Sequence, residues 1–169
     1  TLLVFLSDNG GCAEPYKDLG GGRFSDINDL DQSGAISYGQ GWANASNTPF
    51  QKFKVFSHEG GISTPLVIHW PAGLKTTPGT TTSHPSQLLD LMPTILEVTG
   101  ADYPERFADH PIHPLEGNSL ARLLNGEACQ PAPWMYWEHS GHKAVRHGDF
   151  KALLPRREKA WQLYHLAND

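Results

Sequence analysis

Two residues with oxygen-donating side chains, Asp8 and Asn9, stand where an apolar run ends in a polar turn. A carboxylate and an amide carbonyl are hard oxygen donors, which suit Ca²⁺ or Mg²⁺ better than Zn²⁺. Two adjacent ligands do not complete the coordination of such an ion, so further ligands must come from elsewhere. Asp-Asn-Gly is also ordinary turn chemistry. On these residues alone, a metal site and a simple turn both remain open.

Lys54 is the candidate anion-binding residue. Phe53 and Phe56 flank it and can hold it in a partly dry pocket, where an ammonium group binds an anion strongly. The alternative is a solvated lysine beside core aromatic residues, which is the ordinary situation of a lysine.

His58 is the candidate for lining the same pocket. It lies four residues after Lys54 and directly before Glu59, Gly60 and Gly61. Titratable residues that gather in one pocket are candidates for function. The two glycines permit a sharp bend immediately before the next apolar segment.

The elements that must position these residues follow from the apolar pattern. The continuous apolar run over residues 2–6 is typical of a strand buried on both faces, as in a parallel sheet. Ligands of open α/β sheets bind at the carboxyl ends of such strands, where Asp8 and Asn9 stand. Residues 12 to about 50 are rich in Gly, Asp, Asn and Ser and are predicted to form a long loop. Residues 62–70 are predicted to form a second strand.

Later in the chain, a helix is predicted from Asp90, as its N-cap, to Gly100, with Pro93 in its first turn. A short helix is predicted over residues 119–124. Residues 129–133 contain two prolines and indicate a boundary. After this boundary, alternating segments predict a small antiparallel sheet with a hairpin turn at residues 147–149. The predicted strands are residues 134–138, residues 143–145 leading into 150–154, and residues 161–166.

The composition is that of a loop-rich globular protein. Of 169 residues, 38% are hydrophobic and 18% are charged, which excludes a disordered chain. The formal net charge of -5 argues against a general nucleic-acid binder. No apolar run approaches the roughly 18 residues that a membrane-spanning helix needs. The chain begins inside an apolar strand without Met and ends without a polar tail, so we expect a fragment of a longer protein.

Taken together, these motifs resemble the sulfatase family, and within it the bacterial arylsulfatase type. The resemblance covers nearly all 169 residues in order. One such motif would be weak evidence, whereas several in register are strong. The matching segments are residues 7–11, Lys54 with residues 59–61, Pro65 with residues 70–71, residues 90–94, residues 117–120, residues 144–151 and residues 161–164.

The resemblance implies an α/β fold of the alkaline-phosphatase-like sulfatase kind. Residues 1–128 would form the later part of the catalytic α/β domain and its main sheet, and residues 129–169 a small, truncated C-terminal antiparallel β subdomain. The substrate would be a sulfate ester, either an aryl sulfate or a sulfated carbohydrate. The resemblance also implies a periplasmic or secreted protein.

The resemblance assigns roles to the candidate residues as well. Asp8 and Asn9 match the second pair of ligands to an active-site divalent metal, Ca²⁺ in preference to Mg²⁺. Lys54 matches the catalytic lysine that contacts the sulfate oxygens. The family's nucleophile is a formylglycine made from Cys or Ser in a Cys/Ser-x-Pro-x-Arg motif, which the family places upstream of Asp8.

Two stretches of this chain mimic the nucleophile motif, at residues 63–67 and 129–133. Each lacks the final Arg, and each lies downstream of Asp8, so we reject both. The chain alone is therefore expected to be inactive. Two alternatives stay open: a phosphoesterase or phosphonate monoester hydrolase on the same scaffold, and a non-catalytic sulfatase-like binder of sulfated sugars.

Overall fold

The computed structural model describes residues 1–14 and 39–168, which fall into two compact units. Unit 1 consists of Thr1–Val4 and Val67–Pro133, and unit 2 consists of Phe5–Leu66 and Trp134–Asp169. Each unit thus joins segments that are distant in sequence. The division predicted between residues 128 and 129 remains a prediction.

Helices are concentrated before residue 125, and the last third of the chain is made of strands. In chain order the elements are β1 (Leu3–Leu6), α1 (Gly39–Ser46), α2 (Glu59–Ile62), β2 (Leu66–His69), the 3₁₀ helix η3 (Leu88–Asp90), α3 (Leu91–Thr99), β3 (Arg106–Phe107), β4 (His110–Pro111), α4 (Ala121–Leu124), β5 (Trp134–His139), β6 (His142–His147), β7 (Phe150–Leu154) and β8 (Gln162–His165). None of the helices among the described residues is long and apolar enough to cross a membrane.

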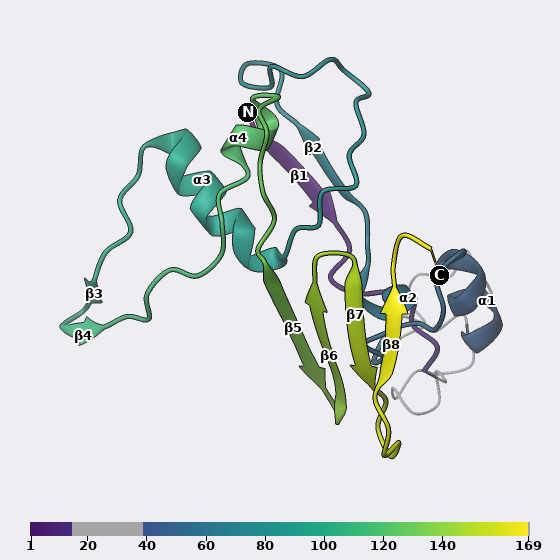
Figure 1. Cartoon of the computed structure of the whole chain (residues 1–169). Coiled ribbons are helices and arrows are strands. Elements are labelled where there is room, and N and C mark those ends of the chain that lie inside the picture. The colour runs from purple at the N-terminus through teal and green to yellow at the C-terminus, as the bar shows by residue number, and fades with distance from the viewer. Residues whose placement is uncertain (15–38, 169) are drawn as a thin grey trace, which may run out of the picture. The chain divides into compact units, whose positions relative to one another are not determined.

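Strands β1 and β2 form a two-stranded sheet (Figure 1). The Thr64 Oγ1 donates a hydrogen bond of 2.8 Å to the Ser7 carbonyl, which places the end of β1 beside the start of β2. Leu3 and Phe5 are 55% and 69% exposed. The expectation that this apolar run is buried on both faces is therefore wrong for the described part of the chain, because a two-stranded sheet leaves these side chains uncovered.

Helix α1 lies inside the segment that was predicted to be a loop. Its single buried residue is Ala43, while Trp42 is 71% exposed. The loop prediction is wrong for Gly39–Ser46, because two glycines give this segment a low helix propensity that its buried contact overrides. Residues 12–14 and 47–50 are turn or irregular structure, as predicted, and residues 15–38 lie outside the described residues.

In unit 1, α3 ends as predicted, with Gly100 in the left-handed conformation at φ 69°. Asp90 occupies the predicted N-cap position, but its side chain does not cap α3. Its two carboxylate oxygens accept hydrogen bonds from the amides of Gln87, at 2.7 Å, and Asn118, at 2.8 Å. Asp90 therefore caps η3 and ties it to the segment before α4.

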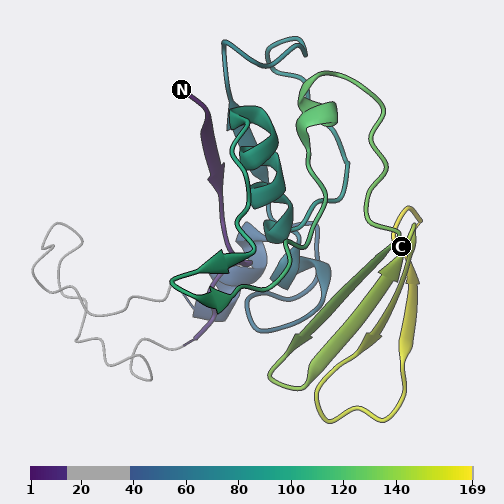
Figure 2. The ribbon, with the colours of Figure 1, turned by 90° about the vertical axis from the view of Figure 1, so that its left-hand side faces the viewer.

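Helices α3 and α4 lie side by side (Figure 2). The Thr94 Oγ1 accepts a hydrogen bond of 2.8 Å from the Leu120 amide and donates one of 2.6 Å to the Asp90 carbonyl. Leu120, Ala121 and Leu124 are buried here. The short helix predicted from residue 119 is confirmed, although it begins at Ala121.

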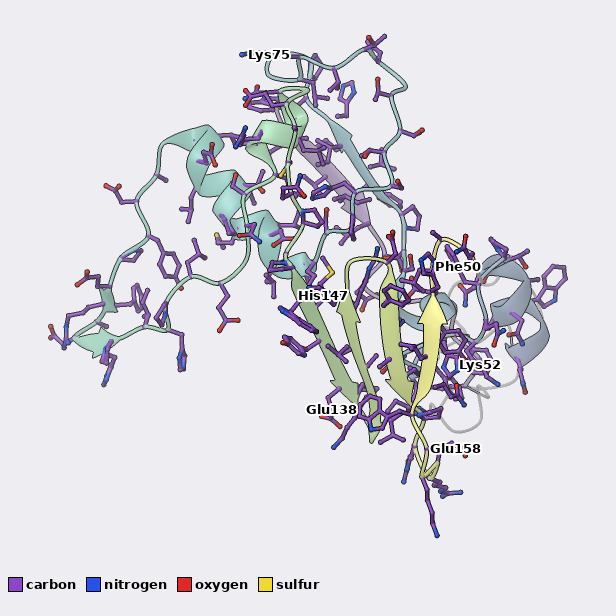
Figure 3. All side chains as sticks on the ribbon, viewed as in Figure 1. Phe50, Lys52, Lys75, Glu138, His147 and Glu158 are labelled. Atoms are coloured by element: carbon purple, nitrogen blue, oxygen red, sulfur yellow. The ribbon has the colours of Figure 1, made fainter. Side chains whose placement is uncertain are left out.

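In unit 2, the last four strands form one antiparallel sheet in the order β5-β6-β7-β8 (Figure 1). The predicted hairpin is confirmed, since His147 pairs with Phe150 across Gly148 and Asp149. Figure 3 shows Glu138 and Glu158 near the end of the sheet where β5 turns into β6, and His147 at the opposite end.

One face of this sheet is buried. Side chains alternate between faces along each strand, and the buried members of unit 2 on these strands are Met135, His142, Ala144, Lys151 and Leu153. A lysine among them is unusual, since lysines are almost never fully buried unless they are paired.

Candidate functional site

The turn after β1 is held by backbone and amide hydrogen bonds. The Gly10 amide donates to the Gly61 carbonyl at 3.0 Å, and the Gly11 amide donates to Asn47 Oδ1 at 3.0 Å. Gly10 is buried, and a Cβ at this position would collide with the Gly60 carbonyl oxygen. The turn that carries Asp8 and Asn9 is thus packed closely against the backbone of α2.

Asp8 is exposed and Asn9 is half-buried at this turn. Asn9 uses its Nδ2 to donate to the Gly10 carbonyl at 3.0 Å, so its Oδ1 is the atom that can bind a cation. Together the two residues offer two hard oxygen donors, a fraction of the roughly six to eight that Ca²⁺ takes. They fit part of a calcium site, and their assignment as metal ligands stays a prediction.

Within residues 1–14 and 39–168, no group of three or more His, Cys, Asp or Glu side chains is arranged to hold a metal ion. Asp8 and Asn9 are thus not accompanied, within those residues, by a cluster of such side chains that would complete a calcium site.

Lys54 is joined to the same turn by its backbone. Its amide donates to the Gly11 carbonyl at 3.0 Å, and its Nζ lies 3.1 Å from Glu14 Oε2. The hydrogen bond and charge of Glu14 raise the pKa of Lys54, and the charge of Asp8 raises it further. Lys54 is therefore a cation, close enough to Asp8 to be affected by its charge.

The pair of Lys54 and Glu14 is open to solvent, with side-chain exposures of 37% and 38%. Hydrogen bonds from Lys54 and from the Cys12 thiol lower the pKa of Glu14. Exposed pairs of this kind contribute little to stability. The ammonium of Lys54 can therefore exchange this carboxylate for another anion.

His58 precedes α2 and is half-buried. Its pKa is lowered to about 4, first by burial and then by the charges of Lys52 and Lys151. Its ring lies 5.8 Å from that of Phe56. Its Nδ1 is buried and has no hydrogen-bond partner among the described residues. His58 is therefore a neutral imidazole at neutral pH, and its role as a substrate-binding residue stays a prediction.

Glu59, the first residue of α2, forms an ion pair that the sequence did not indicate. Its Oε1 lies 2.5 Å from Lys151 Nζ on β7, and the same Nζ lies 5.3 Å from the centre of the Trp137 ring. Burial lowers the pKa of Lys151, and the charge and hydrogen bond of Glu59 oppose that shift. Glu59 and Lys151 each stand in a motif of the resemblance, but 92 residues separate them, and only the fold reveals that they pair.

The structure thus brings three predicted residues together: Asp8 and Asn9 lie on the turn after β1, and the Lys54 backbone is hydrogen-bonded to that turn. His58 directly precedes α2, which packs against the same turn. Known proteins match over a part of the chain that contains these residues. The Sulfatase family model matches residues 1–101, which is more than half of the chain. The chain belongs to the sulfatase family.

Two curated relatives illustrate the similarity. An uncharacterized sulfatase of Schizosaccharomyces pombe is 29% identical over 192 aligned positions, which cover 100% of this chain and 33% of the relative. The arylsulfatase of Klebsiella aerogenes is 35% identical over 133 positions, covering 73% of this chain and 28% of the relative. The chain therefore spans about a third of the length of these sulfatases.

Solved structures agree with the alkaline-phosphatase-like sulfatase fold. The crystal structure of Ps i-CgsB matches with a TM-score of 0.61 and 27% identity, over 99% of this chain and 30% of that one. A sulfatase from the glycosaminoglycan metabolism of Bacteroides thetaiotaomicron matches with a TM-score of 0.57 over 99% of this chain and 33% of that one. At 18% identity, the second likeness shows the fold alone. The expected fold class is confirmed.

Proposed function

We propose that the full-length sulfatase to which this chain belongs hydrolyses sulfate esters in the manner of an arylsulfatase. One observation carries the proposal: the amide of Lys54 donates to the carbonyl of Gly11. The candidate anion-binding residue is thereby attached to the turn that carries the candidate metal ligands. The relatives that are named as sulfatases and arylsulfatases support it.

Lys54 is the residue that this chain contributes to charge stabilisation. Its ammonium is held in the cationic form, as the raised pKa shows, and it is partly exposed. In the proposed role it contacts the sulfate oxygens and offsets negative charge that develops on the leaving oxygen. The carboxylate of Glu14, which it now contacts, leaves when the sulfate ester binds.

Asp8 and Asn9 would hold one side of a Ca²⁺ ion through the carboxylate and the amide oxygen. When bound, this ion supplies charge that polarises the sulfate group. The formylglycine nucleophile and the other metal ligands belong, in this proposal, to a part of the protein before this chain. The chain by itself is then inactive.

We propose an aryl sulfate or a sulfated carbohydrate as the substrate. The relatives include an N-acetylglucosamine-6-O-sulfatase of Bacteroides thetaiotaomicron and an ulvan-active sulfatase of Formosa agariphila, 28% and 30% identical. A periplasmic or secreted location is likewise proposed, on the family resemblance alone.

The test is sulfate release from an aryl sulfate by the full-length protein. We expect Lys54→Ala to lower kcat/KM by roughly two orders of magnitude, because it removes a charge from the reacting group. Lys75→Ala, which removes an exposed lysine from unit 1, is the matched control and should retain the wild-type rate. Equal rates for Lys54→Ala and the wild type would remove Lys54 from the mechanism.

Asp8→Ala tests the metal assignment in the same assay. We expect it to abolish calcium-dependent activity and to lower calcium content, measured on the purified protein. Unchanged metal occupancy would contradict the assignment. Release of phosphate from an aryl phosphate, in preference to sulfate, would favour a phosphoesterase instead. Binding of sulfated sugars without hydrolysis would favour a non-catalytic protein.

A further inference from the structure

The ion pair of Lys151 and Glu59 is the most buried ion pair among the described residues. The Lys151 side chain is 2% exposed and that of Glu59 is 22% exposed, with 2.5 Å between Nζ and Oε1. The Trp137 ring lies 5.3 Å from the same ammonium. A charge so placed requires its partner, because an unpaired ion in a protein interior is strongly disfavoured.

The partner, Glu59, begins the segment that supports the site. The next residue, Gly60, donates its amide to the Gln51 carbonyl at 3.0 Å, and Gly61 accepts the hydrogen bond from the Gly10 amide at 3.0 Å. Neither glycine leaves room for a side chain. A Cβ at Gly60 would collide with the Lys52 carbonyl, and one at Gly61 would collide with the Phe56 carbonyl.

These contacts connect a lysine on the sheet to the turn of the candidate metal ligands. Lys151 fixes Glu59, Glu59 begins α2, and α2 holds Gly10 directly after Asp8 and Asn9. Because the packing is backbone against backbone, a displacement of α2 has no flexible side chain to absorb it. The displacement would reach the turn itself.

We propose that Lys151 is a positioning residue, which acts through Glu59 and α2 to hold the Asp8–Asn9 turn and Lys54 in place for sulfate-ester hydrolysis. The catalytic part of this inference rests on the proposed function, whereas the positioning part is a property of the fold. The contacts of the Lys151 ammonium are with Glu59 and with the Trp137 ring, so the proposed role acts through Glu59.

The test compares amide hydrogen exchange in the full-length protein and its variants. Lys151→Met keeps an apolar chain of similar length beside Trp137 and removes the charge. We expect the amides of Gly10 and Lys54, which are bonded to Gly61 and Gly11, to exchange about tenfold faster or more. The Leu124 amide, bonded to the Leu120 carbonyl in unit 1, is the internal control and should keep its wild-type rate.

Kinetics with an aryl sulfate give the second readout. Lys151→Met is expected to lower kcat about tenfold with a smaller change in KM, because misplaced groups weaken the transition state most. Lys151→Arg, which keeps the charge, should recover most of kcat. Arg122→Gln is the control variant, because it breaks an exposed ion pair instead of a buried one. The side chains of Arg122 and Glu127 in that pair are 65% and 53% exposed.

Two results would overturn the inference. One is a folded Lys151→Met protein in which Gly10 and Lys54 exchange as in the wild type. The other is faster exchange of Gly10, Lys54 and Leu124 alike, which indicates a general loss of stability. If Lys151→Met does not fold, the double variant Lys151→Met with Glu59→Gln, which leaves no unpaired charge, is judged by the same two results. If the wild-type protein releases no sulfate, the proposed function is wrong. The exchange rates of Gly10 and Lys54 would still decide whether Lys151 positions the turn.

Discussion

Among its described residues, unit 2 contains two lysine–glutamate pairs that differ mainly in their access to water. Lys54 and Glu14 lie 3.1 Å apart and are each more than one-third exposed. Lys151 and Glu59 lie 2.5 Å apart, with the lysine 2% exposed. The pKa of Lys54 is raised by its partner, whereas burial lowers the pKa of Lys151. The same two residue types therefore serve opposite purposes: an exposed pair can exchange its anion, and a buried pair is fixed.

The largest expected difference between the two ion pairs is the loss of stability when the lysine of each is replaced. We expect Lys151→Met to lower the free energy of unfolding of unit 2 by about 3 kcal/mol, because it leaves Glu59 without its partner. Lys54→Met should leave the melting temperature unchanged, since that lysine lies in an exposed pair. Thermal unfolding followed by calorimetry measures both. Similar losses of stability in the two variants would contradict the distinction between an exposed and a buried pair.

A smaller effect is expected from acid, and it arises near the buried pair. The pKa of His58 is lowered from 6.5 to about 4 in the folded protein. The folded state therefore binds a proton less readily than the unfolded state, and the corresponding stability is present above pH 6.5 and is lost as the pH falls toward 4. Melting temperature measured across this range should fall, and His58→Phe should fall less steeply. Parallel curves for the two proteins would show that His58 does not contribute.

The smallest effect concerns the exposed pair alone. Glu14→Gln removes the main cause of the raised pKa of Lys54, so more of that lysine is neutral at about pH 9. Acetylation of Lys54 at this pH, followed by mass spectrometry, should be modestly faster in the variant. Acetylation of Lys75 serves as the reference within the same sample. A slower reaction at Lys54 would contradict the assigned cause, and the melting temperature should not change.

The sequence predicted the elements whose signals are local. The antiparallel sheet after residue 133 follows from alternating side chains and from a Gly–Asp turn between adjacent strands. The end of α3 follows from Gly100, which adopts a left-handed conformation. Such features depend on neighbours a few residues away, and for this reason single-chain patterns reveal them.

Features that depend on distant neighbours were missed. Helix α1 has a poor helical composition and gains from burying Ala43, which no local pattern shows. The prediction that Phe5 is buried is wrong for the described residues, because burial depends on which other segments cover the strand. The Lys151–Glu59 pair joins residues 92 positions apart. The closeness of Lys54 to the turn that carries Asp8 and Asn9 could be predicted, whereas the packing that supports this turn could not. The functional roles of these residues stay predictions.

The close packing of Gly10, Gly60 and Gly61 has a consequence for redesign. At each of these three positions a side chain would meet a carbonyl oxygen of the neighbouring backbone, so none of the three tolerates substitution. Attempts to change substrate preference by directed evolution would therefore gain little from randomising these three glycine positions. Substitutions would be tolerated instead at exposed side chains outside this packing, of which Trp42, 71% exposed, is one.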